Sequence, residues 1–371
     1  MKIKRIFDEI FSMENLYRAY KNASKNRRYE PEVLEYGCDL WENLSNLRAR
    51  IYAGNYCIDR YHIFFIQEPK RRMIMSIAFE HRIVQWAIYQ VLFPILSRGY
   101  IEDSYGCING RGASGAVKRL SGWMQYVSLK EGDWYYLKLD ISKYFYRVPH
   151  DKLIAALRRK IHDDRLTCLL ANIINCDHTA FGLPRWAKPE DVPMRKRLFT
   201  VGMPIGNLMS QLFANLYLDQ LDQYCKRKMR IHFYIRSMDD IIILGDSKQV
   251  LHAWRDEIRK YLIEELGLDL NSKTCIRPIY AGCEFIGYKF RPGHVAVRRS
   301  TTLHIKRSIK AVTVAYAEGR KTLQQVSDSV RSYVSLLTSN DSRAFGMKLC
   351  GQIVLRRNDS KARDGPIPVP A

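Results

Sequence analysis

Residues 233–244 read FYIRSMDDIIIL, a pattern that predicts two short strands joined by a tight turn. In the first strand, apolar positions alternate with polar or amphipathic ones, as in a strand with one buried face. The second strand, Ile241 to Leu244, is wholly apolar. The turn carries Asp239 and Asp240, and two carboxylates held between such strands are suited to binding divalent metal through oxygen ligands. An acidic turn without a metal is the alternative that this stretch alone leaves open.

The acidic turn has a counterpart earlier in the chain. Trp134 to Leu139 reads as a strand that ends at Asp140, followed by the start of a helix. From Trp134 to about Pro278 the predicted order is strand–helix–helix–strand–strand–helix–strand, which is that of a split βαβ sheet with helices on one face. In that arrangement Asp140 lies beside Asp239, although the two are far apart in the sequence. Three carboxylates from separate strands meet the requirement for two-metal phosphoryl transfer.

Apolar residues at helical spacing predict the main helices of the chain. Residues 8–54 are expected to be helical, with a basic, polar connector at 22–28, and further helices are expected over residues 79–96, 152–174, 208–224 and 247–267. Ser247 is the expected N-cap of the last of them, and Gly267 its C-terminal stop.

The charge of the chain points to a polyanionic partner. The 371 residues include 60 Lys and Arg against 38 Asp and Glu, a net charge of +22. An excess this large favours nucleic acid over a membrane surface. No apolar run approaches the roughly 18 residues of a membrane span, and the N-terminus leads into no signal-peptide core. The nine cysteines form no C-x-x-C pair, so we expect a cytoplasmic protein with reduced cysteines and no zinc site.

The set of motifs resembles a reverse transcriptase from about Glu14 to Arg357. Five short blocks occur in that family's order, and together they are far more specific than any one of them. They are Pro69 to Arg72, which resembles the fingertip; Asp140 to Phe145, the first catalytic block; Met238-Asp239-Asp240, the end of the Y-x-D-D block; Leu268 to Thr274, the block with Lys273; and Phe285 to Tyr288, the primer grip.

The resemblance implies an α+β fold of the right-hand polymerase type, with fingers, a split-βαβ palm and a small helical thumb. We expect N-terminal helices and fingers over residues 1–133, and the palm, with part of the fingers between its motifs, over 134–290. The thumb is expected over 291–357. Residues 358–371, which contain three prolines, are expected to form a disordered tail.

The resemblance also implies roles for individual residues. Two Mg²⁺ ions, with Mn²⁺ as an alternative, would be bound by the carboxylates of Asp140, Asp239 and Asp240 and by the backbone carbonyl of Ile141. Residues expected to bind the incoming nucleotide are Lys70, Arg72, Phe145, Ile205, Gly206 and Lys273. Of these, Phe145 matches the aromatic residue that excludes a ribose 2′-hydroxyl. Residues expected to contact template or primer are Gln211, Met238, Phe285, Gly287, Tyr288, Lys306 and Lys310.

The sequence departs from the usual reverse transcriptase pattern at two places, and one of them indicates which branch of the family it resembles. Ser237 stands where the family usually has Tyr, which leaves the metal ligands intact. Residues 205–211 read IGNLMSQ where most reverse transcriptases have a Q-G-x-x-x-S-P block. The I-G-x-x-x-S-Q form resembles the diversity-generating retroelement branch, and so do the segments 14–20 and 78–85. Enzymes of that branch copy a template-repeat RNA with errors at adenines.

The branch implies a set of partners and a cellular setting. The partners would be template RNA, nascent cDNA, deoxynucleoside triphosphates and a small, basic, oligomeric helper protein, in the cytoplasm of a bacterial host. A phage-defence or retron-like reverse transcriptase with a different template remains the nearest alternative. A non-catalytic RNA-binding protein with a polymerase fold is the second, and the clustered carboxylates argue against it. The template RNA, the priming mode and the oligomeric state stay open.

Overall fold

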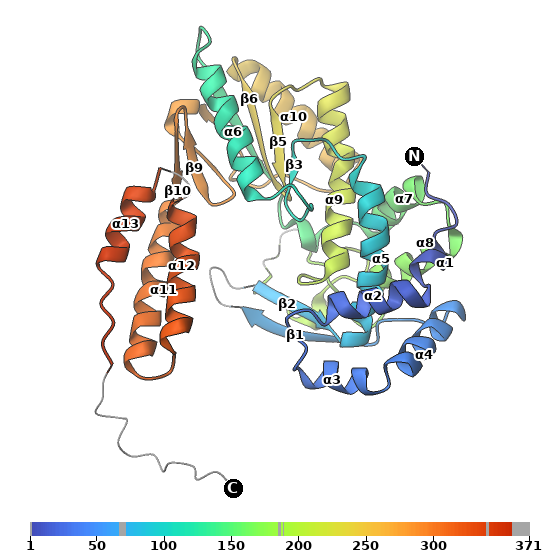
Figure 1. Cartoon of the computed structure of the whole chain (residues 1–371). Helices are drawn as coiled ribbons and strands as arrows, with labels where there is room; N and C mark the ends of the chain where they lie inside the picture. The colour runs from blue at the N-terminus through green and yellow to red at the C-terminus, as the bar shows by residue number, and fades with distance from the viewer. Residues whose placement is uncertain (1, 67–71, 185–186, 188, 339–340, 358–371) are drawn as a thin grey trace. The chain divides into compact units, whose positions relative to one another are not determined.

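The computed structural model describes residues 2–66, 72–184, 187, 189–338 and 341–357. The chain forms two compact units. The first comprises Met1–Ala116 and Leu137–Ile276, and the second comprises Val117–Tyr136 and Arg277–Ala371. Figure 1 shows the elements of both. Among the described residues, no helix is both long enough and apolar enough to span a membrane.

The central element is a mixed five-stranded sheet in the order β3-β5-β6-β4-β7. Its strands are β3 (Ser104–Tyr105), β4 (Tyr135–Asp140), β5 (Tyr234–Ser237), β6 (Asp240–Gly245) and β7 (Cys275–Pro278). β5 and β6 form the predicted antiparallel hairpin, with Ser237 opposite Asp240, and β3 pairs with β5 in parallel.

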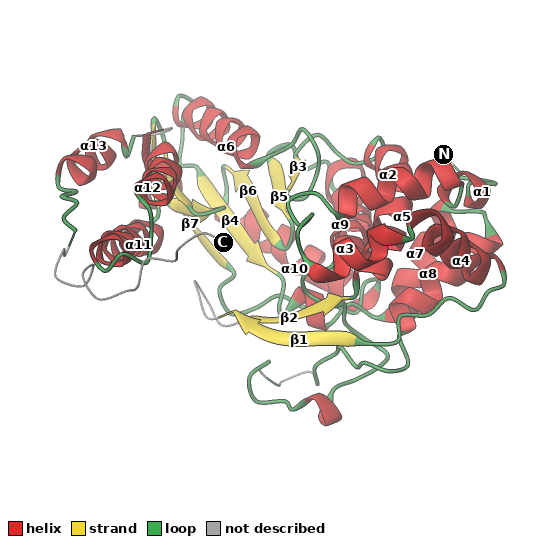
Figure 2. Cartoon of the chain, turned by 60° about the horizontal axis from the view of Figure 1, so that its bottom comes forward, coloured by secondary structure: helices red, strands yellow, loops and turns green. Residues whose placement is uncertain are grey.

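Helices surround this sheet and a second, two-stranded sheet. The helices of the first unit are α1 (Phe7–Ile10), α2 (Met13–Ala23), α3 (Pro31–Cys38), α4 (Leu40–Tyr52), α5 (Phe79–Ser97), α7 (His150–Lys160), α8 (Asp164–Asn175), α9 (Leu208–Gln223) and α10 (Lys248–Glu264). α6 (Ala113–Ser128) begins in this unit and ends in the second. The small sheet pairs β1 (Tyr61–Ile66) with β2 (Arg72–Ile77), and both strands lie side by side in Figure 2.

α9 is the helix around which the first unit packs. It contacts α5, α7 and α10, and most of its residues are buried, Asp219 and Asp222 among them. A helix that is buried on nearly all sides belongs to a core. Two acids on such a helix must be paired, because an unpaired buried charge is costly.

The described part of the second unit combines most of α6 with a three-stranded sheet and three further helices. Its elements are β8 (Cys283–Phe285), β9 (Tyr288–Arg291), β10 (His294–Val297), α11 (Arg299–Ala317), α12 (Leu323–Thr338) and α13 (Arg343–Gly351). Its core comprises Val297, Ile305, Ile309, Leu337 and Leu349. The predicted fold class, α+β with a palm sheet and a small helical thumb, is confirmed.

Two local predictions were wrong. The helix expected over 152–174 is interrupted, because Ile161 turns extended and pairs with Ile3. Asp163 then accepts from the Leu166 N–H and caps α8. β5 was expected to bury one face only, yet Tyr234 and Arg236 on its other face are also fully buried. The reason for that burial lies in the contacts of Arg236, described below.

Candidate active site

The turn between β5 and β6 has an unusual backbone. Met238 has φ 55°, in the left-handed region that residues other than glycine seldom occupy. Its N–H donates to the Tyr105 carbonyl (3.4 Å), and its own carbonyl accepts from Arg236 Nη1 (3.0 Å). Gly106 packs against the turn so closely that a Cβ there would lie 3.0 Å from Met238 Cγ. The two aspartates therefore follow a residue whose conformation is fixed from both sides.

Asp140 lies next to this turn. β4, which ends at Asp140, is the sheet neighbour of β6, and the Ile141 N–H donates to the Asp239 carbonyl (3.3 Å). The structure thus brings together the three carboxylates that the sequence singles out. Asp140 ends β4, Asp239 lies in the turn, and Asp240 begins β6. The Asp140 and Asp240 side chains are 21% and 28% exposed, so a ligand can reach them.

Cations and an amide surround the carboxylates. Lys138 Nζ lies 3.2 Å from Asp240 Oδ1, and Lys273 Nζ lies 3.9 Å from Asp140 Oδ2. Asn271 donates from its side chain to Asp140 Oδ2. The segment that carries Asn271 is held against β4, because its N–H donates to the Asp140 carbonyl (2.9 Å).

The carboxylates repel one another. Burial raises the pKa of Asp239, and Asp140 adds to that rise while Arg72 and Arg236 oppose it. Burial also raises the pKa of Asp240, to about 6, although Lys138 opposes the rise. Acids crowded and desolvated in this way favour a bound cation, since a cation offsets the repulsion between them.

The donor set fits a magnesium-type ion by its chemistry. It consists of carboxylate oxygens, with the Ile141 carbonyl beside them, and Mg²⁺ is bound through oxygen. Asp240 Oδ1 is buried and accepts no hydrogen bond of normal geometry. Within the described ranges, no three acidic, His or Cys side chains stand in ligating geometry. Asp140 contacts Asn271 and Lys273, and Asp240 contacts Lys138.

The residues expected around the nucleotide lie on three other segments. Lys70 is outside the described residues. Arg72 is exposed at the start of β2, and its charge acts on the pKa of Asp239. Phe145 is half-buried in the 3₁₀ helix Tyr144–Tyr146, whereas Tyr144 is fully buried and donates its hydroxyl to the Ala214 carbonyl.

Ile205 and Gly206 lie against β2. The Ile205 carbonyl accepts from the Met75 N–H (2.9 Å), and a Cβ on Gly206 would approach Ile74 Cγ2 to 2.8 Å. Gly206 has φ 107°, so both its conformation and its contact require glycine. The Ile205 and Gln211 side chains are half-buried.

A comparison with known families identifies the fold that carries this site. Residues 67–290 match the family model described as reverse transcriptase (RNA-dependent DNA polymerase). The chain belongs to the reverse transcriptase family. The prediction that it is an RNA-directed DNA polymerase is therefore confirmed.

Relatives of this reverse transcriptase come from bacteria and from introns. It is 29% identical over 281 residues to protein YkfC of Escherichia coli, covering 66% of this chain and 70% of that protein. It is 20% identical over 399 residues to the group II intron-encoded protein LtrA of Lactococcus lactis, covering 89% of this chain but only 62% of LtrA. Among solved structures, telomerase from Candida tropicalis is similar with a TM-score of 0.48 and 14% identity, covering 85% of this chain and 59% of that one.

The remaining predicted residues of the reverse transcriptase lie in the second unit. Phe285 is fully buried, Gly287 has φ 88°, and Tyr288 packs on the core of that unit. Lys306 and Lys310 are exposed on α11.

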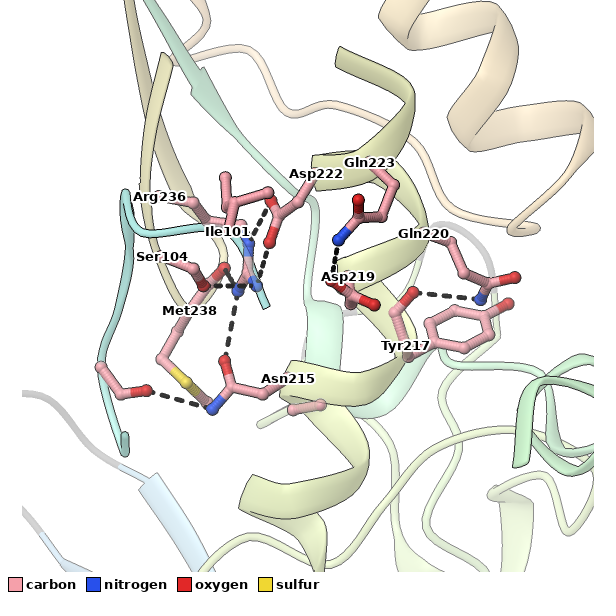
Figure 3. Close-up of polar contacts among 12 residues, drawn as sticks. Ile101, Ser104, Asn215, Tyr217, Asp219, Gln220, Asp222, Gln223, Arg236 and Met238 are labelled. Carbon is pink, nitrogen blue, oxygen red and sulfur yellow. Dashed lines mark hydrogen bonds and ion pairs between the residues drawn. The ribbon is translucent and has the colours of Figure 1, made fainter. Parts of the chain in front are cut away.

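Sequence reasoning missed the buried ion pair beside the β5–β6 turn. Arg236 and Asp222 are both fully buried and form a two-pronged ion pair, which Figure 3 shows beside the turn. Burial lowers the pKa of Arg236, but the charge and hydrogen bonds of Asp222 more than offset that effect. The pKa of Arg236 is therefore raised above its ordinary value. Asp222, which follows the apolar Leu218 and Leu221 on this helix, was the available signal, since a buried acid needs a cation.

Proposed function

We propose that this reverse transcriptase copies RNA into DNA by two-metal nucleotidyl transfer at Asp140, Asp239 and Asp240. The observation that carries the proposal is the meeting of Asp140 with the Asp239–Asp240 turn, linked by the Ile141 N–H to the Asp239 carbonyl. When bound, the two ions supply activation of the primer 3′-hydroxyl and neutralisation of the leaving pyrophosphate. Asp140, Asp239 and Asp240 are the residues that would hold the ions. Mg²⁺ is the expected ion, with Mn²⁺ as an alternative.

The cations of the site would hold the triphosphate. Arg72 is exposed and close enough to influence Asp239, so its guanidinium can donate to phosphate oxygens with a bidentate fork. Lys273 Nζ lies 3.9 Å from Asp140 Oδ2 and would bind the leaving pyrophosphate. Lys138, which pairs with Asp240, would be displaced toward solvent or phosphate when the carboxylate binds an ion.

Phe145 would select deoxynucleotides. Tyr144 and Tyr146 are the buried residues of this 3₁₀ helix, whereas Phe145 is half-buried and its carbonyl accepts from the Met203 N–H. A flat ring under the sugar leaves no room for a 2′-hydroxyl. The half-exposed ring is available for that contact.

We further propose that the enzyme serves a diversity-generating retroelement in a bacterial cytoplasm. This assignment rests on the I-G-x-x-x-S-Q block at 205–211 and implies a template-repeat RNA, an error-prone cDNA and a basic, oligomeric helper protein. A phage-defence or retron-like reverse transcriptase with another template RNA is the second candidate.

Sequencing the RNA that co-purifies with the protein from its native host separates the two candidates. A template-repeat RNA with a matching variable repeat in the genome is the expected result. Primer extension on that RNA, with the cDNA sequenced, should show substitutions concentrated at template adenines. A bound RNA that lacks such a repeat, copied without adenine errors, would contradict the retroelement role and leave the polymerase assignment intact.

A further inference from the structure

Arg236 uses every N–H donor that it has. Nε and Nη2 donate to the two carboxylate oxygens of Asp222 at 2.7 and 2.6 Å. Nη2 also donates to Ser104 Oγ (2.9 Å), and Nη1 donates to Asn215 Oδ1 (3.3 Å) and to the Met238 carbonyl (3.0 Å). An arginine has five such donors, so none is left over. Figure 3 shows these contacts converging on one guanidinium.

The five bonds tie two separate segments to the turn. Asp222 and Asn215 come from α9, and Ser104 comes from β3. Asn215 also donates to the Gly106 carbonyl (3.1 Å), so the loop that packs under the turn joins the same network. The remaining bond holds the carbonyl of Met238, which directly precedes Asp239.

A core role alone does not explain this arrangement. Replacing a buried ion pair with apolar residues of similar size is often neutral or stabilising, so a pair that only fills space has no advantage over them. A lysine would keep the charge but has no planar fork to reach Asp222 and Met238 at once. What the arginine adds is a fixed position for a left-handed backbone residue next to the metal-binding acids.

We propose that Arg236 is a positioning residue: through Met238 it sets the direction in which Asp239 and Asp240 present their carboxylates to divalent ions. The inference rests on the two-metal function proposed above. Asp222 holds Arg236 in place and acts through it, without touching the site. Residues that orient metal ligands in this way typically change metal affinity or activity about 10- to 100-fold when they are replaced.

The test measures metal binding directly, apart from catalysis. Mn²⁺ is titrated into the purified chain, and free Mn²⁺ is followed by electron paramagnetic resonance. The wild type is compared with Asp239→Asn to identify the binding due to this site. The main variant is Arg236→Met with Asp222→Leu, which removes both buried charges and leaves no unpaired one. Arg236→Lys is the second variant, in case the double replacement does not fold; thermal unfolding checks both.

A matched control is available on the same helix. Asp219 is 2% exposed and pairs with Lys160 at 3.0 Å, and in the described structure neither side chain hydrogen-bonds the β5–β6 turn. Lys160→Met with Asp219→Leu therefore removes an ion pair that joins α9 to α7, in which Asp219 is buried and Lys160 is 38% exposed, without releasing Met238. We expect the Arg236 variants to bind Mn²⁺ about 10-fold or more weakly, and the control pair to match the wild type.

The outcomes separate the inference from the function on which it rests. If folded Arg236 variants bind Mn²⁺ as tightly as the wild type, Arg236 is only a core residue and the inference is wrong. If the control pair loses as much affinity as the Arg236 variants, the effect is one of general packing, which also overturns it. If Asp239→Asn binds Mn²⁺ like the wild type, the proposed metal site itself is wrong, and the inference is overturned with it.

Discussion

The β5–β6 hairpin and the segments expected around the nucleotide are built in opposite ways. The hairpin is fixed by buried charge: Arg236 and Asp222 have no exposed side-chain surface and hold the turn through side-chain bonds. Arg72 is exposed, and Ile205 and Phe145 are half-buried and tied to neighbouring segments by backbone hydrogen bonds. Side chains at those three positions can therefore change with little effect on the fold. We infer that the hairpin supplies geometry, while the surrounding positions supply selectivity.

The largest effect on activity is expected from Asp239→Ala. Losing a metal ligand removes several kcal/mol of charge stabilisation, so magnesium-dependent primer extension on RNA should fall by about 10³-fold or more. The fold should survive, because burial and Asp140 both raise the pKa of Asp239 and its charge therefore opposes folding at neutral pH. Extension near the wild-type rate would contradict the assignment.

The largest effect on stability is expected from Asp222→Ala. Removing one partner leaves the fully buried Arg236 charge unpaired, which costs about 3–5 kcal/mol. Arg72→Ala, at an exposed position, should change the free energy of unfolding by less than about 0.5 kcal/mol. Urea unfolding of both variants measures the contrast. Equal losses would show that the two regions are not built differently.

A smaller effect on selectivity is expected from Phe145→Val. A smaller side chain opens space for a 2′-hydroxyl, and pockets that reject a group by fit alone discriminate by about 10- to 100-fold. Ribonucleotide incorporation should rise by up to that factor, while deoxynucleotide incorporation and thermal stability change little. Tyr144→Phe is the control, since it removes a buried hydroxyl that donates to Ala214 and should affect stability instead. An unchanged sugar preference would assign Phe145 to packing.

Arg72→Ala should weaken nucleotide binding by about 10- to 100-fold. A charge-assisted hydrogen bond to phosphate contributes roughly 1.5–3 kcal/mol, and its loss should raise the KM for nucleotide in steady-state extension. RNA affinity, measured by filter binding, should stay within about twofold, since one phosphate contact among many is lost at most. Weaker RNA binding with an unchanged KM would reassign Arg72 to the template.

Local patterns in the sequence predicted the strands that carry the three aspartates and the helices α5 and α9. The apolar run after Asp240 and the acid at the end of β4 are features of a few adjacent residues, and both strands formed as expected. The helices α5 and α9 follow from apolar spacing in the same way. Hydrophobic periodicity gave the wrong burial where a charged side chain has a partner far away in the sequence. A periodic pattern assigns every charged residue of a strand to the solvent-exposed face.

Arg236 and Asp163 illustrate that failure. Arg236 is buried because Asp222 and Ser104, at 14 and 132 positions away, supply acceptors that no local pattern reveals. Asp163 interrupts a predicted helix because its carboxylate accepts from the Ile6 and Phe7 N–H groups, more than a hundred positions earlier. Likewise, Lys138 and Asn271 reach the site carboxylates from distant segments, so only the structure places them there.

The smallest effect is expected at Ile205 and concerns fidelity. In the usual family block a Gln at this position has both a donor and an acceptor near the nascent base pair. Isoleucine has similar bulk but forms no hydrogen bond. The difference in binding free energy between a correct and a mismatched base is therefore smaller. A hydrogen bond of this kind contributes about 0.5–1.5 kcal/mol, which corresponds to roughly two- to tenfold in discrimination.

The structure makes Ile205→Gln a clean replacement. The backbone at this position is held by the Met75 N–H and by the close approach of Gly206 to Ile74, neither of which involves the side chain. Misincorporation is counted separately opposite each template base, with Ile205→Leu as the control that keeps an apolar side chain. We expect Ile205→Gln to lower errors at template adenines by two- to tenfold, and Ile205→Leu to leave them unchanged. An error spectrum that does not change, or that falls equally at all four bases, would leave Ile205 as a packing residue against β2.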